Sequence, residues 1–274
     1  MADAKLTTLA GLGAYDVGES DDRPPLILLH GLTFDHTMWL PTLAELDGID
    51  HGRRALALDL PGHGASATSE SYDIESVAEV VHRAVGEAGL DAPVIVGHSL
   101  AAIVASVYAA RFPTCGVVNV DQSLQTAPFS RFLQSIAEQL RGPNFPAMWE
   151  QFLASMHIDL LPHAGQELVR STSNPEQDLV LGYWRDVLER PMNELLEWTE
   201  ERLAALRAAA THYVVVAGSE PEAEYREWLG QKLPQATVTV FPGSGHFPHL
   251  AHPDRFAKCL AETGSWNAKS SGPS

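Results

Sequence analysis

Short, mostly apolar runs alternate along this chain with longer segments in which apolar residues recur at helical spacing. The runs lie at residues 26–29, 54–58, 94–96, 116–120, 212–217 and 237–241. Nearly unbroken apolar runs of this length are typical of strands buried on both faces of a parallel sheet. Between two of them, residues 74–85 repeat Ile, Val and Ala every three or four positions, and Asp73 precedes them as a helix-starting residue. The alternation predicts an α/β fold with helices on both faces of the sheet.

One long stretch breaks this alternation. Residues 122–207 have helical periodicity, contain no convincing buried strand and are rich in aromatic residues: Phe129, Phe132, Phe145, Trp149, Phe152, Tyr183, Trp184 and Trp198. We expect a helical cap, inserted after the sixth strand and lying over the carboxyl edge of the sheet. The core then comprises residues 1–121 and 208–264, with an edge hairpin near its start. Residues 265–274, rich in Ser and Gly, are expected to form a disordered tail.

The run at 94–96 leads directly into Gly97-His98-Ser99-Leu100-Ala101, and an alanine-rich, helix-favouring segment follows at once. A strand that turns sharply into a helix holds a serine in a strained conformation, with its hydroxyl exposed above the sheet. The helix N-terminus behind that serine offers free N–H groups that suit an oxyanion. The pattern is that of a nucleophile elbow, G-x-S-x-G, with alanine in the last position. Taken alone, a serine at a helix start is more often a simple N-cap.

Three further motifs follow predicted strands and change that interpretation. They are His30-Gly31, Asp59-Leu60-Pro61-Gly62-His63-Gly64 and Gly243-Ser244-Gly245-His246. Together with the elbow, they stand in the order found in the α/β-hydrolases, which the chain resembles from its first strand to its last helix. The resemblance implies a mostly parallel eight-stranded sheet and a catalytic triad in the chain order Ser, acid, His.

The resemblance makes Ser99 the nucleophile and His246 its general base, because a serine hydroxyl needs a base within hydrogen-bond reach. The acid has two candidates. The family usually places it after the strand at 212–217, where Glu220 stands. In two similar branches, the zearalenone-type lactonases and the cofactor-free quinolone dioxygenases, it ends the preceding strand, where Asp121 stands. We favour Asp121, whose role is to fix the tautomer of His246 and to stabilise its imidazolium form.

Both branches also resemble this chain near its end. The segments 241–248 and 252–258 are similar to the lactonase tail, whereas Glu220-Pro221-Glu222 is similar to a dioxygenase segment. The dioxygenases carry His-Ser-His at the elbow, and here the second histidine is replaced by Leu100. The dioxygenase interpretation is therefore kept as an alternative.

The resemblance also implies where the oxyanion and the substrate bind. The oxyanion hole is expected to consist of the backbone N–H groups of Leu32 and Leu100. His30, His63 and His98 are expected to support turns and packing. For a largely apolar substrate pocket we select four residues of the cap, Trp149, Phe152, Met156 and Trp184.

Composition narrows the setting of this chemistry. The 274 residues include 35 acidic and 18 basic side chains, a net charge of −17, which argues against nucleic acid or anionic membrane as partners. The two cysteines, Cys115 and Cys259, lack metal-ligand spacing, and no phosphate loop or dinucleotide fingerprint occurs, so we expect no metal and no cofactor. Without a signal-peptide pattern or an apolar run of membrane-spanning length, we expect a cytoplasmic protein, as a monomer or homodimer.

These observations predict a serine hydrolase that cleaves a carboxylic ester or lactone of a hydrophobic small molecule through an acyl-enzyme on Ser99. Two alternatives stay open. One is a cofactor-independent dioxygenase of a hydroxyquinolone-like aromatic substrate that uses His246 and Asp121. The other is a non-catalytic small-molecule receptor built on the same fold.

Overall fold

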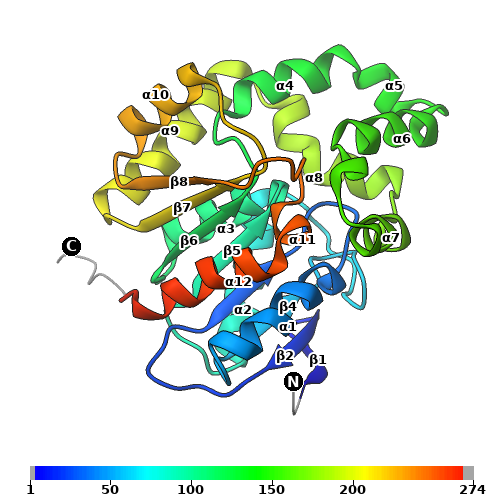
Figure 1. The fold of residues 1–274 in the computed structure, drawn as a ribbon. Coiled ribbons are helices and arrows are strands. Elements are labelled where there is room, and N and C mark those ends of the chain that lie inside the picture. Colours follow the sequence, from blue (N-terminus) through cyan, green and yellow to red (C-terminus); the bar gives the residue numbers. More distant parts are fainter. Residues whose placement is uncertain (1–3, 268–274) are drawn as a thin grey trace.

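An eight-stranded sheet lies between two layers of helices in the computed structural model, which describes residues 4–267 (Figure 1). The strands are β1 (Lys5–Leu9), β2 (Leu12–Val17), β3 (Leu26–Leu29), β4 (Ala55–Leu58), β5 (Val94–His98), β6 (Gly116–Val120), β7 (His212–Ala217) and β8 (Ala236–Val240). Their order across the sheet is β1-β2-β4-β3-β5-β6-β7-β8. β2 pairs antiparallel with both β1 and β4, and the strand pairs from β4 to β8 are parallel. The predicted mostly parallel, eight-stranded α/β sheet is confirmed.

Helices cover both faces of this sheet. They are α1 (Leu40–Ile49), α2 (Ile74–Glu87), α3 (Leu100–Arg111), α4 (Thr126–Ser135), α5 (Ala137–Arg141), α6 (Phe145–Ser155), α7 (His163–Thr172), α8 (Gln177–Glu189), α9 (Met192–Ala208), α10 (Ala223–Lys232), α11 (Pro248–Ala251) and α12 (Pro253–Glu262), with the 3₁₀ turns η1 (His36–Trp39), η2 (Ile158–Leu160) and η3 (Thr263–Ser265). None of the helices in the described part of the chain is both long enough and apolar enough to cross a membrane.

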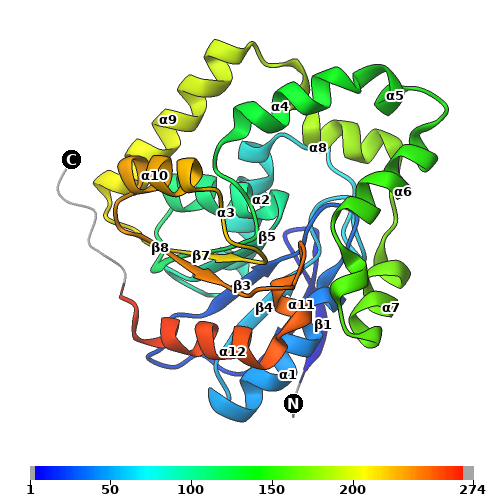
Figure 2. The ribbon, with the colours of Figure 1, turned by 45° about the horizontal axis from the view of Figure 1, so that its top comes forward.

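Alternate residues of the central strands serve two separate cores. In β3, Ile27 and Leu29 pack in the cluster that includes α2, α3, α9 and α10, whereas Leu26 and Leu28 pack in the cluster that includes α1 and α12. Figure 2 shows these two helical layers on opposite sides of the sheet. Because successive side chains point to opposite faces, a strand covered on both sides must be apolar throughout, as these runs are.

The chain between β6 and β7 forms only helices and turns, α4 to α9 with η2. Contacts with loops that follow strands hold this segment in place. The Tyr183 hydroxyl donates to the Pro61 carbonyl at 2.9 Å, and the His246 N–H donates to the Met156 carbonyl at 3.0 Å. Helix α9 differs from the others because it contacts α3 and α10 in the layer over the sheet. The last helix of the predicted cap therefore also packs on the core, and it contacts α4 of the cap as well.

The start of the predicted tail needs correction. Ser265 ends η3, and Trp266 stacks on His212, with 5.1 Å between the ring centroids. The indole also covers Gly116, where an added Cβ would lie 2.5 Å from it. The large apolar ring of Trp266 packs on the surface formed by His212 and Gly116, although the residues that follow it in the chain are rich in Ser and Gly. Residues 268–274 of the predicted tail lie outside the described residues.

Candidate active site

Three strands end at the same level of the sheet and bring the candidate residues to one edge. The register pairs His98 of β5 with Val120 of β6, and Val120 with Val216 of β7. Ser99 and Asp121 are the next residues after β5 and β6. They therefore stand side by side at the carboxyl edge of the sheet, where α/β folds build their sites.

Ser99 occupies a strained turn between β5 and α3. Its backbone angles are φ 54° and ψ −132°, a conformation that non-glycine residues seldom adopt and that nucleophile elbows require. The tight contact of the turn falls on Gly97, where a Cβ would lie 2.3 Å from the Ala101 carbonyl oxygen. Ala101 itself is completely buried in the first turn of α3. The fold thus accommodates the methyl group of Ala101, which replaces the last glycine of the G-x-S-x-G pattern. The glycine that the turn requires is Gly97.

His246 and Asp121 form a direct pair. The Nδ1–H of His246 donates to Oδ2 of Asp121 at 2.8 Å, and the other carboxylate oxygen accepts the backbone N–H of Gly218 at 2.7 Å. Asp121 has φ 56°, a left-handed conformation that aspartate tolerates better than most residues. The alternative acid, Glu220, has a side chain that is 68% exposed and pairs with Arg226. The structure brings Asp121, and not Glu220, to the histidine.

Ser99 and His246, the candidate nucleophile and base, do not contact each other by a hydrogen bond. Within residues 4–267, neither the Ser99 hydroxyl nor Nε2 of His246 makes a hydrogen bond. Such bonds are often long without substrate and tighten only in the reacting complex. Both side chains are half-buried, which leaves them accessible to a small molecule.

His98 joins the elbow to the loop that carries His246. Its Nε2–H donates to the backbone carbonyl of His246 at 2.8 Å, and its side chain is completely buried. Burial, followed by repulsion from His249 and His246, lowers the pKa of His98 well below its usual value, so the ring is neutral. The sequence predicts a packing role for His98. The structure shows in addition that His98 bonds to the loop that carries His246. His98 also explains Gly31, where a Cβ would lie 2.8 Å from Nδ1 of this ring.

Two other histidines fasten the loop after β3. Nδ1–H of His30 donates to the Gly31 carbonyl at 2.8 Å, while Nε2 of the same ring accepts the N–H of Leu60 at 2.9 Å. Nε2 of His63 accepts the N–H of Thr33 at 3.1 Å. Burial lowers the pKa of His63 to about 3, which keeps it neutral and able to accept that bond. His30 and His63 therefore fix the backbone of the loop after β3.

The loop that they hold carries one of the two candidate oxyanion donors. Leu32 lies in it, and Leu100 begins α3 directly after the serine. Among the bonds of the described chain, none uses the backbone N–H of either residue. Both groups are therefore free to bind a substrate oxygen.

The four selected pocket residues divide into two pairs. Phe152 and Met156 line a cleft of about 490 Å³ together with His246 and Asp121. Trp149 and Trp184 do not line it, because α6 and α8 turn both indoles into the hydrophobic core, where they pack with 5.8 Å between centroids. Assigning these two tryptophans to the pocket is wrong at this cleft.

One group of possible metal ligands occurs in the described part of the chain. Asp35, His36 and Asp59 bring ligand atoms within 4.8 Å of one another. Hydrogen bonds already occupy them: Asp59 accepts from the backbone N–H and Nδ1 of His36 and from the N–H of Ala65, and Asp35 caps η1 through the N–H of Thr37. We interpret the cluster as the attachment of the loop after β3 to the end of β4.

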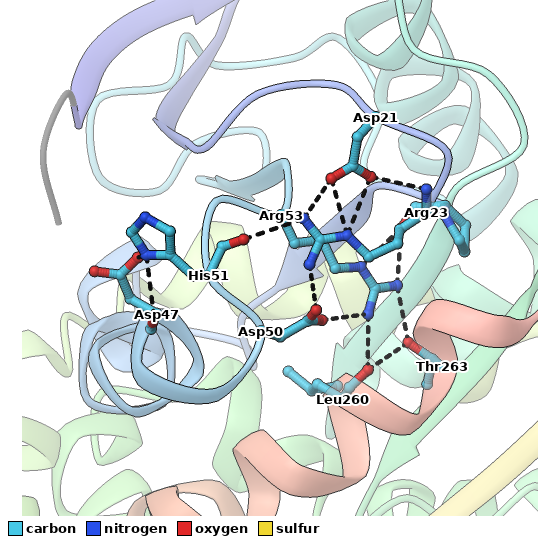
Figure 3. A network of polar contacts seen from close by, with 9 residues as sticks. Asp21, Arg23, Asp47, Asp50, His51, Arg53, Leu260 and Thr263 are labelled. Carbon is cyan, nitrogen blue, oxygen red and sulfur yellow. Dashed lines mark hydrogen bonds and ion pairs between the residues drawn. The ribbon is translucent and has the colours of Figure 1, made fainter.

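A larger hollow, about 770 Å³, lies at the opposite edge of the sheet, near the starts of β3 and β4. Its charged side chains bind one another and the C-terminal helix (Figure 3). The buried Arg53 donates to the carbonyls of Pro24 and Leu260, to the hydroxyl of Thr263 and to Asp50, which also pairs with Arg23. This network fixes structure rather than supplying chemistry.

Comparisons with known proteins agree with this geometry. The chain matches the model of a family described as the alpha/beta hydrolase family over residues 26–258. The pimeloyl-[acyl-carrier protein] methyl ester esterase of Chromobacterium violaceum is 29% identical over 219 residues, which cover 75% of this chain and 81% of that protein.

Solved structures share the fold at lower identity. A thermophilic esterase from Thermogutta terrifontis superposes with a TM-score of 0.71 at 22% identity, over 94% of this chain and 97% of that one. A variant of AqdC, which recognises the Pseudomonas quinolone signal and cleaves its ring, superposes with a TM-score of 0.80 at 18% identity, over 95% of this chain and 98% of that one. The family match spans the elbow, the glycine-histidine motifs at residues 30–31, 59–64 and 243–246, and the His246–Asp121 pair. The chain therefore belongs to the alpha/beta hydrolase family.

Proposed function

We propose that this protein is a serine hydrolase that cleaves a carboxylic ester or lactone of a hydrophobic small molecule. One observation carries the proposal: a strained serine at an elbow shares the sheet edge with a histidine whose Nδ1–H is bonded to a carboxylate. Esterases among the relatives support the class of reaction.

The reaction follows from the position of each group. Ser99 Oγ attacks the ester carbonyl carbon while Nε2 of His246 takes its proton, and the carbonyl oxygen becomes an oxyanion that the N–H groups of Leu32 and Leu100 bind. Collapse of this intermediate breaks the bond to the alkoxy oxygen, to which His246 gives the proton. The acyl group remains on Ser99 as an ester. Water, deprotonated by His246, then attacks that ester, the bond between the acyl carbon and Ser99 Oγ breaks, and His246 returns the proton to Oγ as the acid leaves.

Asp121 serves both halves of this cycle. Accepting the Nδ1–H keeps Nε2 unprotonated before attack, and the carboxylate stabilises the imidazolium formed afterwards. Gly218 N–H holds the second oxygen, so the carboxylate cannot turn away from the ring.

The helices between β6 and β7 serve as the cap, with residues 122–207 as its extent. Phe152 and Met156 present apolar surface to the cleft beside His246, which supports a substrate with a hydrophobic portion.

The test is Ser99→Ala, with Ser135→Ala, an exposed serine of α4, as the matched control. Ser99→Ala should lower kcat for p-nitrophenyl acetate by about 10³-fold or more, with an unchanged far-UV circular dichroism spectrum. Wild-type protein, but not Ser99→Ala, should gain on one serine the mass of a fluorophosphonate less that of HF, because the serine oxygen displaces fluoride from phosphorus. Turnover by Ser99→Ala within tenfold of wild type would contradict the proposal.

A second candidate function is oxygenation without a cofactor. The observation that favours it is the pairing of His246 with an acid at the end of β6, the arrangement that the resemblance to quinolone dioxygenases implies. This pair would deprotonate a hydroxyquinolone, which then reacts with molecular oxygen. Oxygen uptake with such a substrate, retained in Ser99→Ala, would favour this function over hydrolysis.

A further inference from the structure

A narrow cavity of about 40 Å³ is lined by Leu100 and Ile103 of α3, the helix that follows the elbow. Two of its lining residues follow candidate catalytic residues in the chain: Leu100 comes after Ser99, and Gln122 comes after Asp121. Most of the remaining lining is apolar or aromatic, including Ile103, Phe129, Tyr183 and Trp198. The cavity thus lies between the start of α3 and the helices that follow β6.

Trp198 of α9 lines this cavity, and three charged side chains contact its ring. Its Nε1–H donates to the carboxylate of Glu75. The guanidinium of Arg202 lies 4.4 Å from the ring centroid, and that of Arg190 lies 5.5 Å from it. An indole bonded at its edge and covered by two cations has little freedom to turn aside.

The buried guanidinium of Arg202 lies against this ring and has no hydrogen-bond partner among the described residues. The side chain is 4% exposed, and none of its three guanidinium nitrogens has a hydrogen-bond partner in residues 4–267. Burying a cation without partners is costly, and the charge is retained here although burial lowers the pKa to about 10. The Trp198 face is the favourable contact that the guanidinium makes. The wall is therefore a fixed part of the site.

The cavity and the cleft have no lining residue in common. His246, which gives its proton to the leaving alcohol, lines the cleft of about 490 Å³. Leu100, whose N–H is the candidate donor to the carbonyl oxygen, lines the cavity of about 40 Å³. The chemistry of the cycle thus directs the alcohol toward the wide cleft and the acyl group toward the narrow cavity.

We propose that the narrow cavity is the acyl subsite and that Trp198 limits the length of the acyl group. This inference rests on the hydrolase function proposed above. A cavity of about 150 Å³ holds benzene, or about 25 Å³ for each carbon atom, so 40 Å³ holds roughly two carbons. The substrate class is then an ester of a short acid, such as acetate or propionate, with a larger and hydrophobic alcohol.

The test compares kcat/KM for p-nitrophenyl acetate, butyrate and octanoate in wild type, Trp198→Ala and Trp228→Ala. Trp228 is a half-buried tryptophan of α10 outside the cavity, and it is the matched control. Wild type should hydrolyse octanoate at least tenfold less efficiently than acetate. Trp198→Ala should raise the octanoate-to-acetate ratio at least tenfold, and Trp228→Ala should leave it unchanged.

A second variant guards against loss of folding. Phe129→Ala widens the same cavity from α4 and should raise the ratio in the same direction. The acyl subsite is overturned if wild type hydrolyses all three esters equally, or if a folded Trp198→Ala or Phe129→Ala keeps the wild-type ratio. In those cases Ser99-dependent hydrolysis persists, so the proposed function stands. Loss of the proposed function would show instead as no Ser99-dependent turnover of any ester.

Discussion

Replacing Asp121 by asparagine tests the identity of the acid, because it replaces one carboxylate oxygen by an NH₂ group and removes the charge while keeping the shape of the side chain. The carboxylate accepts two bonds, from Gly218 N–H at 2.7 Å and from His246 Nδ1–H at 2.8 Å. Asparagine has one oxygen and one NH₂ group. Its oxygen must face the Gly218 N–H, since two donors cannot face each other, and its NH₂ then faces the imidazole. Asparagine also tolerates the left-handed backbone at this position, φ 56°, so the fold is retained.

The magnitude follows from the tautomer. Opposite an NH₂ group, Nδ1 of His246 must be an acceptor, so the ring carries its proton on Nε2 and cannot accept one from Ser99. A triad histidine locked in the wrong tautomer loses about 10⁴-fold in kcat. At 1.36 kcal/mol for each factor of ten, this is about 5 kcal/mol of transition-state stabilisation.

The assay is kcat for p-nitrophenyl acetate at saturation, with the thermal midpoint of each variant as a check on folding. Glu220→Gln is the control: its carboxylate is exposed and pairs with Arg226, so activity should stay within twofold of wild type. A folded Asp121→Asn with activity within tenfold of wild type would refute the reasoning. So would a loss in Glu220→Gln equal to that in Asp121→Asn.

Three further predictions concern buried polar side chains. His98→Leu should lower kcat ten- to a hundredfold at nearly constant KM, because the backbone carbonyl of His246 loses its hydrogen-bond donor. His98→Gln, whose amide can still donate, should recover most of the activity. Equal losses in both variants would contradict a positioning role. Arg53→Met should lower the free energy of unfolding in urea by about 3 kcal/mol without changing kcat, since it leaves buried carbonyls unpaired far from Ser99. His249 stays neutral in the fold because burial lowers its pKa to about 3, whereas it protonates near pH 6.5 when unfolded. Stability is therefore lost as the pH falls, and His249→Phe should reduce the loss between pH 7.5 and 5.5 by about 1.4 kcal/mol; an unchanged loss would mean that His249 is charged in the fold.

The strands were the part of the fold that the sequence could predict best, and their environment explains why. Strands β3 to β6 are buried along their whole length, and His98 and Asn119 are the only polar residues in them. Helical periodicity carries less information. It identifies the apolar stripe of α9 but not the layers that the helix contacts, which are the core helix α3 and the cap helix α4.

The site residues show the same limit at the level of side chains. Phe152 and Trp149 both belong to α6, yet Phe152 lines the cleft whereas Trp149 lies in the core beside Trp184. The direction of each ring depends on how α6 is rotated against α8, and aromatic content does not specify that rotation. The contact between Arg202 and Trp198 could not be predicted either, because the sequence does not distinguish a buried arginine from a solvent-exposed one.

The geometry of the proposed triad is transmitted mainly through the main chain of the sheet. The N–H of Ser99 donates to the Val120 carbonyl, and the N–H of Asp121 donates to the Val216 carbonyl, both at 2.9 Å. Gly218, two residues further along, returns a bond to the Asp121 carboxylate. Each of these two proposed catalytic residues is thus held to the neighbouring strand by backbone groups, which substitution of a side chain does not remove. Changes in the helices that follow β6 should consequently alter which ester is accepted, while the relation between nucleophile, acid and base persists.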